Sequence, residues 1–220
     1  AAGIAHDINN PLQLILGLAE NLAEEQDLSA VHEQAQDIIE AVKRTSAICR
    51  DLTRYSRRAS PHQDVLVPVN EKLDEALKIA RYASSLHDIA MIKQYQPGAV
   101  VKGNPDELLH VLVNLITNAV HAMERGGGTL TLETALHDGQ VHVRISDTGC
   151  GIAQSKLDEI FEPFFTTKAP GKGTGLGLYN VKTIVNKMHG AIAIDSQIDR
   201  GTTFTLTFPK AEPAEQGCLS

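Results

Sequence analysis

The 220-residue sequence has few cysteines, no long apolar run and fewer basic than acidic side chains. Its three cysteines, Cys49, Cys150 and Cys218, are far apart and form no CxxC pair. This pattern excludes a disulfide framework and a zinc site, and it favours a reducing cytoplasm. No apolar run approaches the ~18 residues of a membrane span, and no basic-then-apolar signal is present. We expect a cytoplasmic chain without direct membrane contact. Its first residues already have a mid-helix pattern, so we expect it to be part of a longer protein, for which a membrane anchor stays an open alternative.

The balance of charge excludes a further class of partner. Lysine and arginine number 20 against 27 acidic residues, which gives a net charge of −7. That sign does not suit non-specific binding to nucleic acid or to an anionic membrane, so neither is expected as a partner. The 42% apolar and 21% charged composition is near the globular average and argues against disorder or a fibrous chain.

Residues 1–60 have the pattern of a helical hairpin. Apolar residues recur every three or four positions along 4–22 and again along 31–52, with a polar stretch at 24–29 between them. The second stripe has the spacing of a coiled-coil seam, and it is wider than one partner helix covers. We therefore predict that two chains dimerise into a four-helix bundle, with packing of the hairpin on the rest of its own chain as the alternative.

The sequence pattern changes after a linker at 61–64, which we expect to act as a hinge. Short strands alternate with helices over 65–210, and a tail follows at 211–220. Asp138-Gly139 predicts a hairpin turn between two alternating runs, and Asn104-Pro105 predicts a capped helix. The expected strands are 65–69, 89–95, 99–102, 129–135, 141–147, 191–196 and 202–208, and the expected helices are 70–86 (capped by Asn70), 104–123, 153–160 and 176–189. The fold class is therefore α+β, a helical hairpin followed by an α/β sandwich in which helices cover one face of a single mixed sheet.

His6 is the first residue that indicates chemistry. At about 100° per residue, the apolar stripe of the first helix lies on one side and His6 points roughly 160–200° away from it. Asn10 lies one turn later on the same outer face. Asp7, beside the imidazole, can hold the ring tautomer and accept a proton when the ring acts as a nucleophile. A structural or merely exposed histidine is the alternative.

Glycines in the second half indicate a phosphate site. Gly173, Gly175 and Gly177 lead into an amphipathic helix, although they match neither a Walker P-loop nor G-x-G-x-x-G. Backbone N–H groups at a helix N-terminus bind phosphate by hydrogen bonds and by the helix dipole. Three of the five phenylalanines lie just before this run, at 161–165, where they can anchor a mobile lid whose Lys168 is available to phosphate. A flexible linker and ordinary core aromatics are the alternatives.

Two further segments are typical of a nucleotide site. Asp147 ends a predicted strand and is followed by Gly149 and Gly151, so backbone can approach a flat ligand while the carboxylate accepts a bond from an amino group such as that of adenine. Asn114 and Asn118 share one helix face, and amide oxygens together with phosphate oxygens suit Mg²⁺. A strand-ending turn and a solvated polar face are the alternatives.

Taken together and in this order, the segments resemble the catalytic core of a sensor histidine kinase of two-component signalling. The resemblance covers about residues 1–208 and implies a dimerisation and histidine-phosphotransfer hairpin followed by an ATP-binding α/β sandwich of the gyrase–chaperone–kinase type. Its boxes are the phospho-accepting box at His6, the N box at 114–118, the D-x-G-x-G box at 147–151, the F box at 161–165, the glycine-rich lid end at 173–177 and G-T-x-F at 201–204.

The resemblance also implies roles for these residues. His6 attacks the γ-phosphate of ATP with Asp7 as acid/base, and the phosphoryl group then passes to an aspartate of a response-regulator receiver domain. Asn10 resembles the residue that positions water to dephosphorylate the regulator. The remaining implied contacts are Asn118 and Asn114 with Mg²⁺ and phosphates, Asp147 with the adenine amino group, Gly149 and Gly151 with the base, and Gly173, Gly175 and Gly177 with phosphates.

Two other functions are compatible with parts of the sequence. A conformational ATPase of the same superfamily closes a clamp on ATP without phosphorylating a residue, and His6-Asp7 on an outward helix face argues against it. A non-catalytic signalling adaptor keeps the bundle and loses ATP binding, and the presence of Asn118, Asp147 and the lid glycines argues against that.

Overall fold

The structure is a computed structural model that describes residues 13–22, 27, 29–39, 41–42, 64–83, 88–124, 126–166 and 175–211. The chain divides into two compact units, each described here by itself. One comprises Ala1–Pro61 with Thr166–Thr174, and the other comprises His62–Phe165 with Gly175–Ser220. Among the helices in the described ranges, none combines the length and apolarity that crossing a membrane requires.

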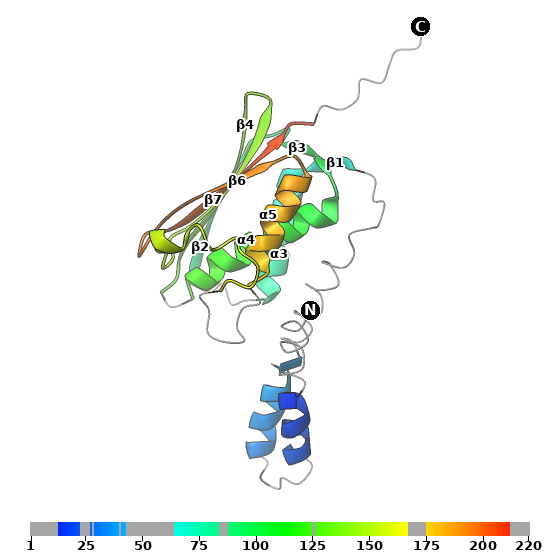
Figure 1. The fold of residues 1–220 in the computed structure, drawn as a ribbon, viewed down its shortest axis with the longest axis vertical. Helices are drawn as coiled ribbons and strands as arrows, with labels where there is room; N and C mark the ends of the chain where they lie inside the picture. The colour runs from blue at the N-terminus through cyan, green and yellow to red at the C-terminus, as the bar shows by residue number, and fades with distance from the viewer. Residues whose placement is uncertain are drawn as a thin grey trace. The chain divides into compact units, whose positions relative to one another are not determined.

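The described part of the first unit is helical at 13–22 and at 29–39 and 41–42, drawn in blue in Figure 1. Asp27 precedes the second segment: its carboxylate accepts the N–H of Ser29 at 3.1 Å and its carbonyl accepts the N–H of Val31 at 2.9 Å. These two bonds satisfy donors that the first helical turn leaves unpaired. The first segment falls within the predicted stripe 4–22, and the second starts two residues before the predicted stripe 31–52; the linker 61–63 and the tail 212–220 lie outside the described residues.

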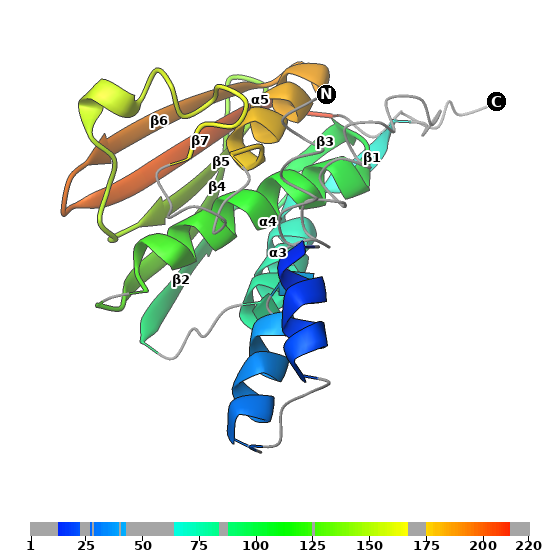
Figure 2. The same ribbon diagram turned by 60° about the horizontal axis from the view of Figure 1, so that its bottom comes forward.

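The described part of the second unit contains a five-stranded mixed sheet, a two-stranded sheet and three α-helices. Strand order is β2-β4-β5-β7-β6; β2 and β4 are parallel and the other neighbours antiparallel. Figures 1 and 2 show the helices on one side of this sheet, which confirms the predicted α+β class. The elements are β1 (Val65–Pro68), α3 (Val69–Ala83), β2 (Ile89–Tyr95), β3 (Val100–Gly103), α4 (Pro105–Ala122), β4 (Gly128–His137), β5 (Gln140–Asp147), the 3₁₀ helix η1 (Gln154–Lys156), α5 (Gly177–Lys187), β6 (Ala191–Gln197) and β7 (Gly201–Pro209).

The core lies between the helices and one face of the sheet. Alternate residues of β5 and β7 are buried, so each strand presents one apolar side to the helices and its other side outward. The α4 helix supplies most of the opposing surface, with fully buried Leu108, Leu112, Leu115 and Ile116. Asn104 caps this helix as predicted, because its side-chain oxygen accepts the N–H groups of Asp106 and Glu107 at 2.8 and 3.3 Å.

Three details of the sequence-based prediction are wrong. First, β1 and β3 form a separate two-stranded sheet, which is joined to the end of the chain after β7 by an isolated bridge between Val101 and Lys210, so there is not a single sheet. Second, the helix predicted at 153–160 is only the three-residue η1 followed by turns, and the structure gives no physical reason for its shortness. Third, α3 begins one residue before Asn70, whose side chain bonds the Gln96 carbonyl at 3.0 Å and the Thr134 hydroxyl at 2.8 Å instead of capping the helix.

Candidate functional site

Polar side chains line up across the sheet at the end where β5 finishes. Asp147 of β5 lies opposite Thr202 of β7, and Thr202 lies opposite Ser196 of β6. All three occupy the alternate positions that face the helices, as buried Ile145 and Phe204 do on the same strands. Asp147 is 7% exposed and Thr202 5% exposed. The carboxylate and two hydroxyls therefore form one cross-strand row, which we call the polar row.

The Asp147 carboxylate is held by backbone donors. Its Oδ1 accepts the N–H of Gly149 at 2.9 Å. Burial raises the pKa of Asp147, and backbone N–H bonds from Gly149 and Thr202 oppose that rise. A buried carboxylate fixed in this way can accept a further hydrogen bond from an amino group of a ligand, and it is shielded from competing water.

The loop after Asp147 has no room for a side chain at either of its glycines. A Cβ on Gly149 would lie 2.6 Å from the Ala122 carbonyl oxygen at the end of α4. Gly151 has φ +66°, and a Cβ there would overlap the Gln197 carbonyl oxygen at the end of β6. Since both glycines contact backbone, the loop is fixed between α4 and β6. The predicted base-pocket glycines thus lie directly beside the polar row.

The N box meets the glycine-rich segment at the start of α5. A Cβ on Gly177 would lie 3.6 Å from Asn114 Oδ1, so the first residue of α5 approaches this α4 side chain closely. Asn114 Nδ2 is buried and has no hydrogen-bond partner among the described residues. Asn118 lies one turn further along α4 and is half-buried. A buried amide donor without a partner, beside a helix N-terminus, is suited to an oxyanion of a ligand.

The F box contacts the glycine-rich segment directly. The N–H of Phe164 donates to the Gly175 carbonyl at 3.0 Å, although the two residues are separated in sequence by the predicted lid. Phe161 and Phe165 pack partly against the core, as expected for apolar anchors, whereas Phe164 is 52% exposed. Lys182 Nζ of α5 lies 5.4 Å from the centre of the Phe161 ring, a cation–π contact that connects α5 to the F box.

The structure thus brings together seven of the predicted site residues in one unit: Asn114, Asn118, Asp147, Gly149, Gly151, Gly175 and Gly177. The others lie outside the described residues: His6, Asp7, Asn10, Lys168 and Gly173. Sequence reasoning missed Ser196 and did not single out Thr202 within G-T-x-F. These two residues are identified by the register in which β5, β7 and β6 pair, and no single sequence segment contains that information.

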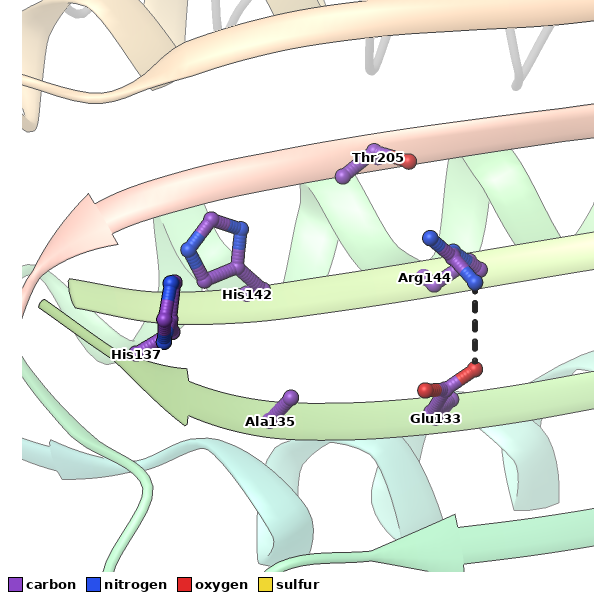
Figure 3. A pocket seen from close by; sticks show the side chains of 6 residues that line it. All are labelled: Glu133, Ala135, His137, His142, Arg144 and Thr205. Atoms are coloured by element: carbon purple, nitrogen blue, oxygen red, sulfur yellow. Dashed lines mark ion pairs between the residues drawn. The ribbon is translucent and has the colours of Figure 1, made fainter.

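A separate groove lies on the other face of the sheet. Figure 3 shows its six lining residues, Glu133, Ala135, His137, His142, Arg144 and Thr205, on β4, β5 and β7. Arg144 lies 3.6 Å from Glu133, and His142 Nδ1 lies 3.3 Å from the Thr207 hydroxyl. None of the seven predicted site residues that the structure describes lines this groove.

Comparison with known proteins identifies the family. Residues 103–212 match the family described as histidine kinase-, DNA gyrase B-, and HSP90-like ATPase, and residues 1–61 match the His Kinase A (phospho-acceptor) domain. The sensor histidine kinase ZraS of Klebsiella oxytoca is 35% identical over 212 residues, covering 95% of this chain and 45% of that protein. The chain therefore spans less than half the length of this curated relative.

Solved structures agree. The mycobacterial sensor histidine kinase MprB has a TM-score of 0.60 and 27% identity, covering 68% of this chain and 99% of that one. Histidine kinase ThkA in complex with the response regulator protein TrrA has a TM-score of 0.75 at 22% identity, covering 96% of this chain and 60% of that one, which shows a shared fold. With both family segments in the predicted order, the chain belongs to the histidine kinase, gyrase B and HSP90-like ATPase family and is a sensor histidine kinase catalytic core.

Proposed function

We propose that this chain phosphorylates His6 from Mg-ATP and passes the phosphoryl group to an aspartate of a response-regulator receiver domain. The observation on which the proposal rests is that one domain contains two features suited to different parts of a ligand. One is the polar row with its buried Asp147, and the other is the meeting of Asn114 with the start of α5. A nucleoside triphosphate needs both, because its base is a flat hydrogen-bonding ligand and its phosphates are anions.

The base end is the polar row. Asp147 accepts the 6-amino group of adenine, and Gly149 and Gly151 let the loop pack against the backbone of α4 and β6, which holds the carboxylate and the loop backbone in place for the flat ring. Because this carboxylate is already bonded to the Gly149 N–H, it needs no reorganisation when the nucleotide enters. ATP is therefore the proposed substrate.

The phosphate end includes the proposed magnesium ligands. Within the described ranges, no three His, Cys, Asp or Glu side chains come together as a metal site, so the ion needs other oxygens. Asn118 supplies an amide oxygen as a ligand, and Asn114 lies one turn away on the same helix. Phosphate oxygens supply further ligands, which fits the preference of Mg²⁺ for few protein ligands. The buried, unpartnered Asn114 amide fits this polar surrounding. When bound, the ion neutralises negative charge on the phosphates. Gly173, Gly175, Gly177 and Lys168 contribute the remaining phosphate contacts.

The transfer step uses the hairpin. The His6 imidazole nitrogen forms a bond to the γ-phosphorus, the bond to the β,γ-bridging oxygen breaks, and ADP leaves. Asp7 orients the ring and accepts its proton. The phosphoryl group then moves from His6 to a carboxylate oxygen of the regulator. ThkA, which shares this fold, has been solved in complex with a response regulator protein, and this supports the choice of partner.

We also propose that the chain acts as a homodimer. Leu14, Leu16, Ile39 and Val42 are each about half exposed in the single chain, more apolar surface than one hairpin covers. Pairing two hairpins into a four-helix bundle would bury it. The proposed boundaries are hairpin 1–60, linker 61–64, catalytic domain 65–210 and tail 211–220, with the whole segment in the cytoplasm, whether or not the parent protein carries a membrane anchor.

Incubation with γ-labelled ATP and Mg²⁺ tests the proposal. We expect acid-labile, alkali-stable label on the protein, lost in His6→Ala and kept in His32→Ala, a control histidine that is exposed in the same unit. ATP turnover without protein label would instead support the conformational ATPase. Absence of nucleotide binding would support the adaptor.

Asn10 has a separate test. We expect Asn10→Ala to slow dephosphorylation of the regulator while sparing autophosphorylation, because this side chain positions the attacking water and not the nucleotide. Equal loss of both activities would refute that role. The measurement is the decay of labelled regulator mixed with each variant.

A further inference from the structure

We infer that Ser196 is a positioning residue that fixes the direction of the Thr202 hydroxyl and so makes the nucleotide site selective for a 6-amino purine. The inference rests on the proposed function, since it concerns the same site. It assigns a role to a residue that no sequence motif singled out.

Ser196 Oγ has three hydrogen-bonding neighbours. The backbone N–H of Ile152 donates to it at 2.8 Å, and the Ser196 hydroxyl donates to the Gly201 carbonyl at 3.1 Å. The third neighbour is Thr202 Oγ1, at 2.9 Å. These contacts connect three segments of the site: the end of the D-x-G-x-G loop, the turn before β7 and the polar row.

The direction of the third bond follows from counting protons. A serine hydroxyl has one proton to donate and two lone pairs to accept. The Ile152 N–H can only donate, so it uses one lone pair, and the Gly201 carbonyl can only accept, so it takes the proton. Only one arrangement makes all three contacts hydrogen bonds at the same time: the Thr202 hydroxyl donates to the remaining lone pair of Ser196.

This leaves Thr202 as an acceptor toward any ligand. Thr202 lies opposite Asp147, and its backbone N–H bonds the Asp147 carboxylate. The polar row thus presents a carboxylate and hydroxyl lone pairs, and no free hydroxyl proton, at neighbouring positions. A 6-amino group can donate to such a surface. A 6-oxo group would meet only acceptors. It would lose its hydrogen bond to water without gaining another, and this unpaired polar group is the reason for its rejection.

Replacing Ser196 by alanine should release the Thr202 hydroxyl. Its proton could then turn toward a 6-oxo group, and the row would accept either purine edge. ATP and ITP share the same phosphates and sugar and differ at the 6-position and at N1, which carries a proton only in ITP, so the comparison that counts is the change in their affinity ratio when Ser196 is replaced. The ratio of their affinities therefore reports the polarity of the row, whereas general loosening of the site would weaken both equally.

The experiment measures Kd for Mg-ATP and Mg-ITP by titration calorimetry on the full chain. We expect the unaltered chain to prefer ATP, Ser196→Ala to lower the ATP:ITP preference about fivefold, and Ser196→Thr, which keeps the hydroxyl, to retain it. Ser146→Ala is the matched control, since Ser146 accepts from the Thr203 hydroxyl at 2.9 Å on the other face of the sheet, and it should leave the preference unchanged.

Equal loss of ATP and ITP affinity in Ser196→Ala would overturn the inference while leaving the proposed function intact. No ATP binding by the unaltered chain would overturn both. If Ser196→Ala does not fold, Ser196→Cys provides the same test, because a thiol is only a weak acceptor, no longer holds the Thr202 proton and should lower the preference. An unchanged preference in that variant would also overturn the inference.

Discussion

Replacement of Asp147 by asparagine tests the base end of the site most directly. The amide has nearly the shape of the carboxylate, and its oxygen can still accept the Gly149 N–H that Asp147 now accepts at 2.9 Å. What is lost is the charge and the second acceptor oxygen, whose place is taken by an NH2 donor. A hydrogen bond to a charged acceptor contributes about 1.5–3 kcal/mol, so ATP affinity should fall roughly 10- to 100-fold.

The fold should tolerate the same change. Burial raises the pKa of Asp147, which means that the protein environment disfavours the charged form and that the charge itself does not stabilise the fold. We therefore expect the free energy of unfolding of Asp147→Asn to stay within about 1 kcal/mol of the unaltered value. Loss of binding without loss of stability is the diagnostic combination.

Titration calorimetry with Mg-ATP and urea denaturation provide the two measurements. Asp195→Asn is a matched control, because Asp195 is exposed on β6, one position before Ser196 and on the opposite face of the sheet. It should change neither quantity. An Asp147→Asn variant that binds ATP within twofold of the unaltered chain would refute the assignment of Asp147 to the base.

Three further outcomes are expected. Gly139 has φ +71° and open space around it, so Gly139→Ala should lower the free energy of unfolding, measured by urea denaturation, by about 1 kcal/mol and leave ATP affinity unchanged. Gly151→Ala must displace the Gln197 carbonyl, so it should lower the free energy of unfolding by about 3 kcal/mol or more and weaken ATP binding. Equal effects of the two substitutions would contradict the packing described for the loop. Asn104→Ala should lose about 1 kcal/mol through the missing α4 cap, and Asn104→Asp should not; a stable alanine variant would mean that the cap contributes little. The ionised carboxylate of Asp147 accepts the amino group, and burial raises its pKa above the ordinary 3.8. ATP affinity, measured by calorimetry over a series of pH values, should therefore weaken as pH falls, beginning at a higher pH than for an ordinary aspartate. Asp147→Asn should lack this pH-dependent loss of affinity.

Local signals predicted most of the catalytic domain. Asn104-Pro105 marks the start of α4 because the cap and the first-turn proline act within three residues, and Asp138-Gly139 forms the β4–β5 turn because both residues adopt positive φ. Prediction failed where a contact distant in sequence decided the outcome. Asn70 resembles a helix cap, but Gln96 and Thr134 bind its side chain and α3 starts earlier.

The sequence by itself determined the family and the site's ingredients, because the order of its boxes is specific and each box is a short local pattern. Only the tertiary structure decided which of these site residues contact one another. Asn114 meets Gly177 because α4 and α5 pack together, and Asp147, Thr202 and Ser196 form one row because β5, β7 and β6 pair in a particular register. Register depends on side-chain packing across the whole sheet, and a shift by one residue would turn every one of these side chains to the other face.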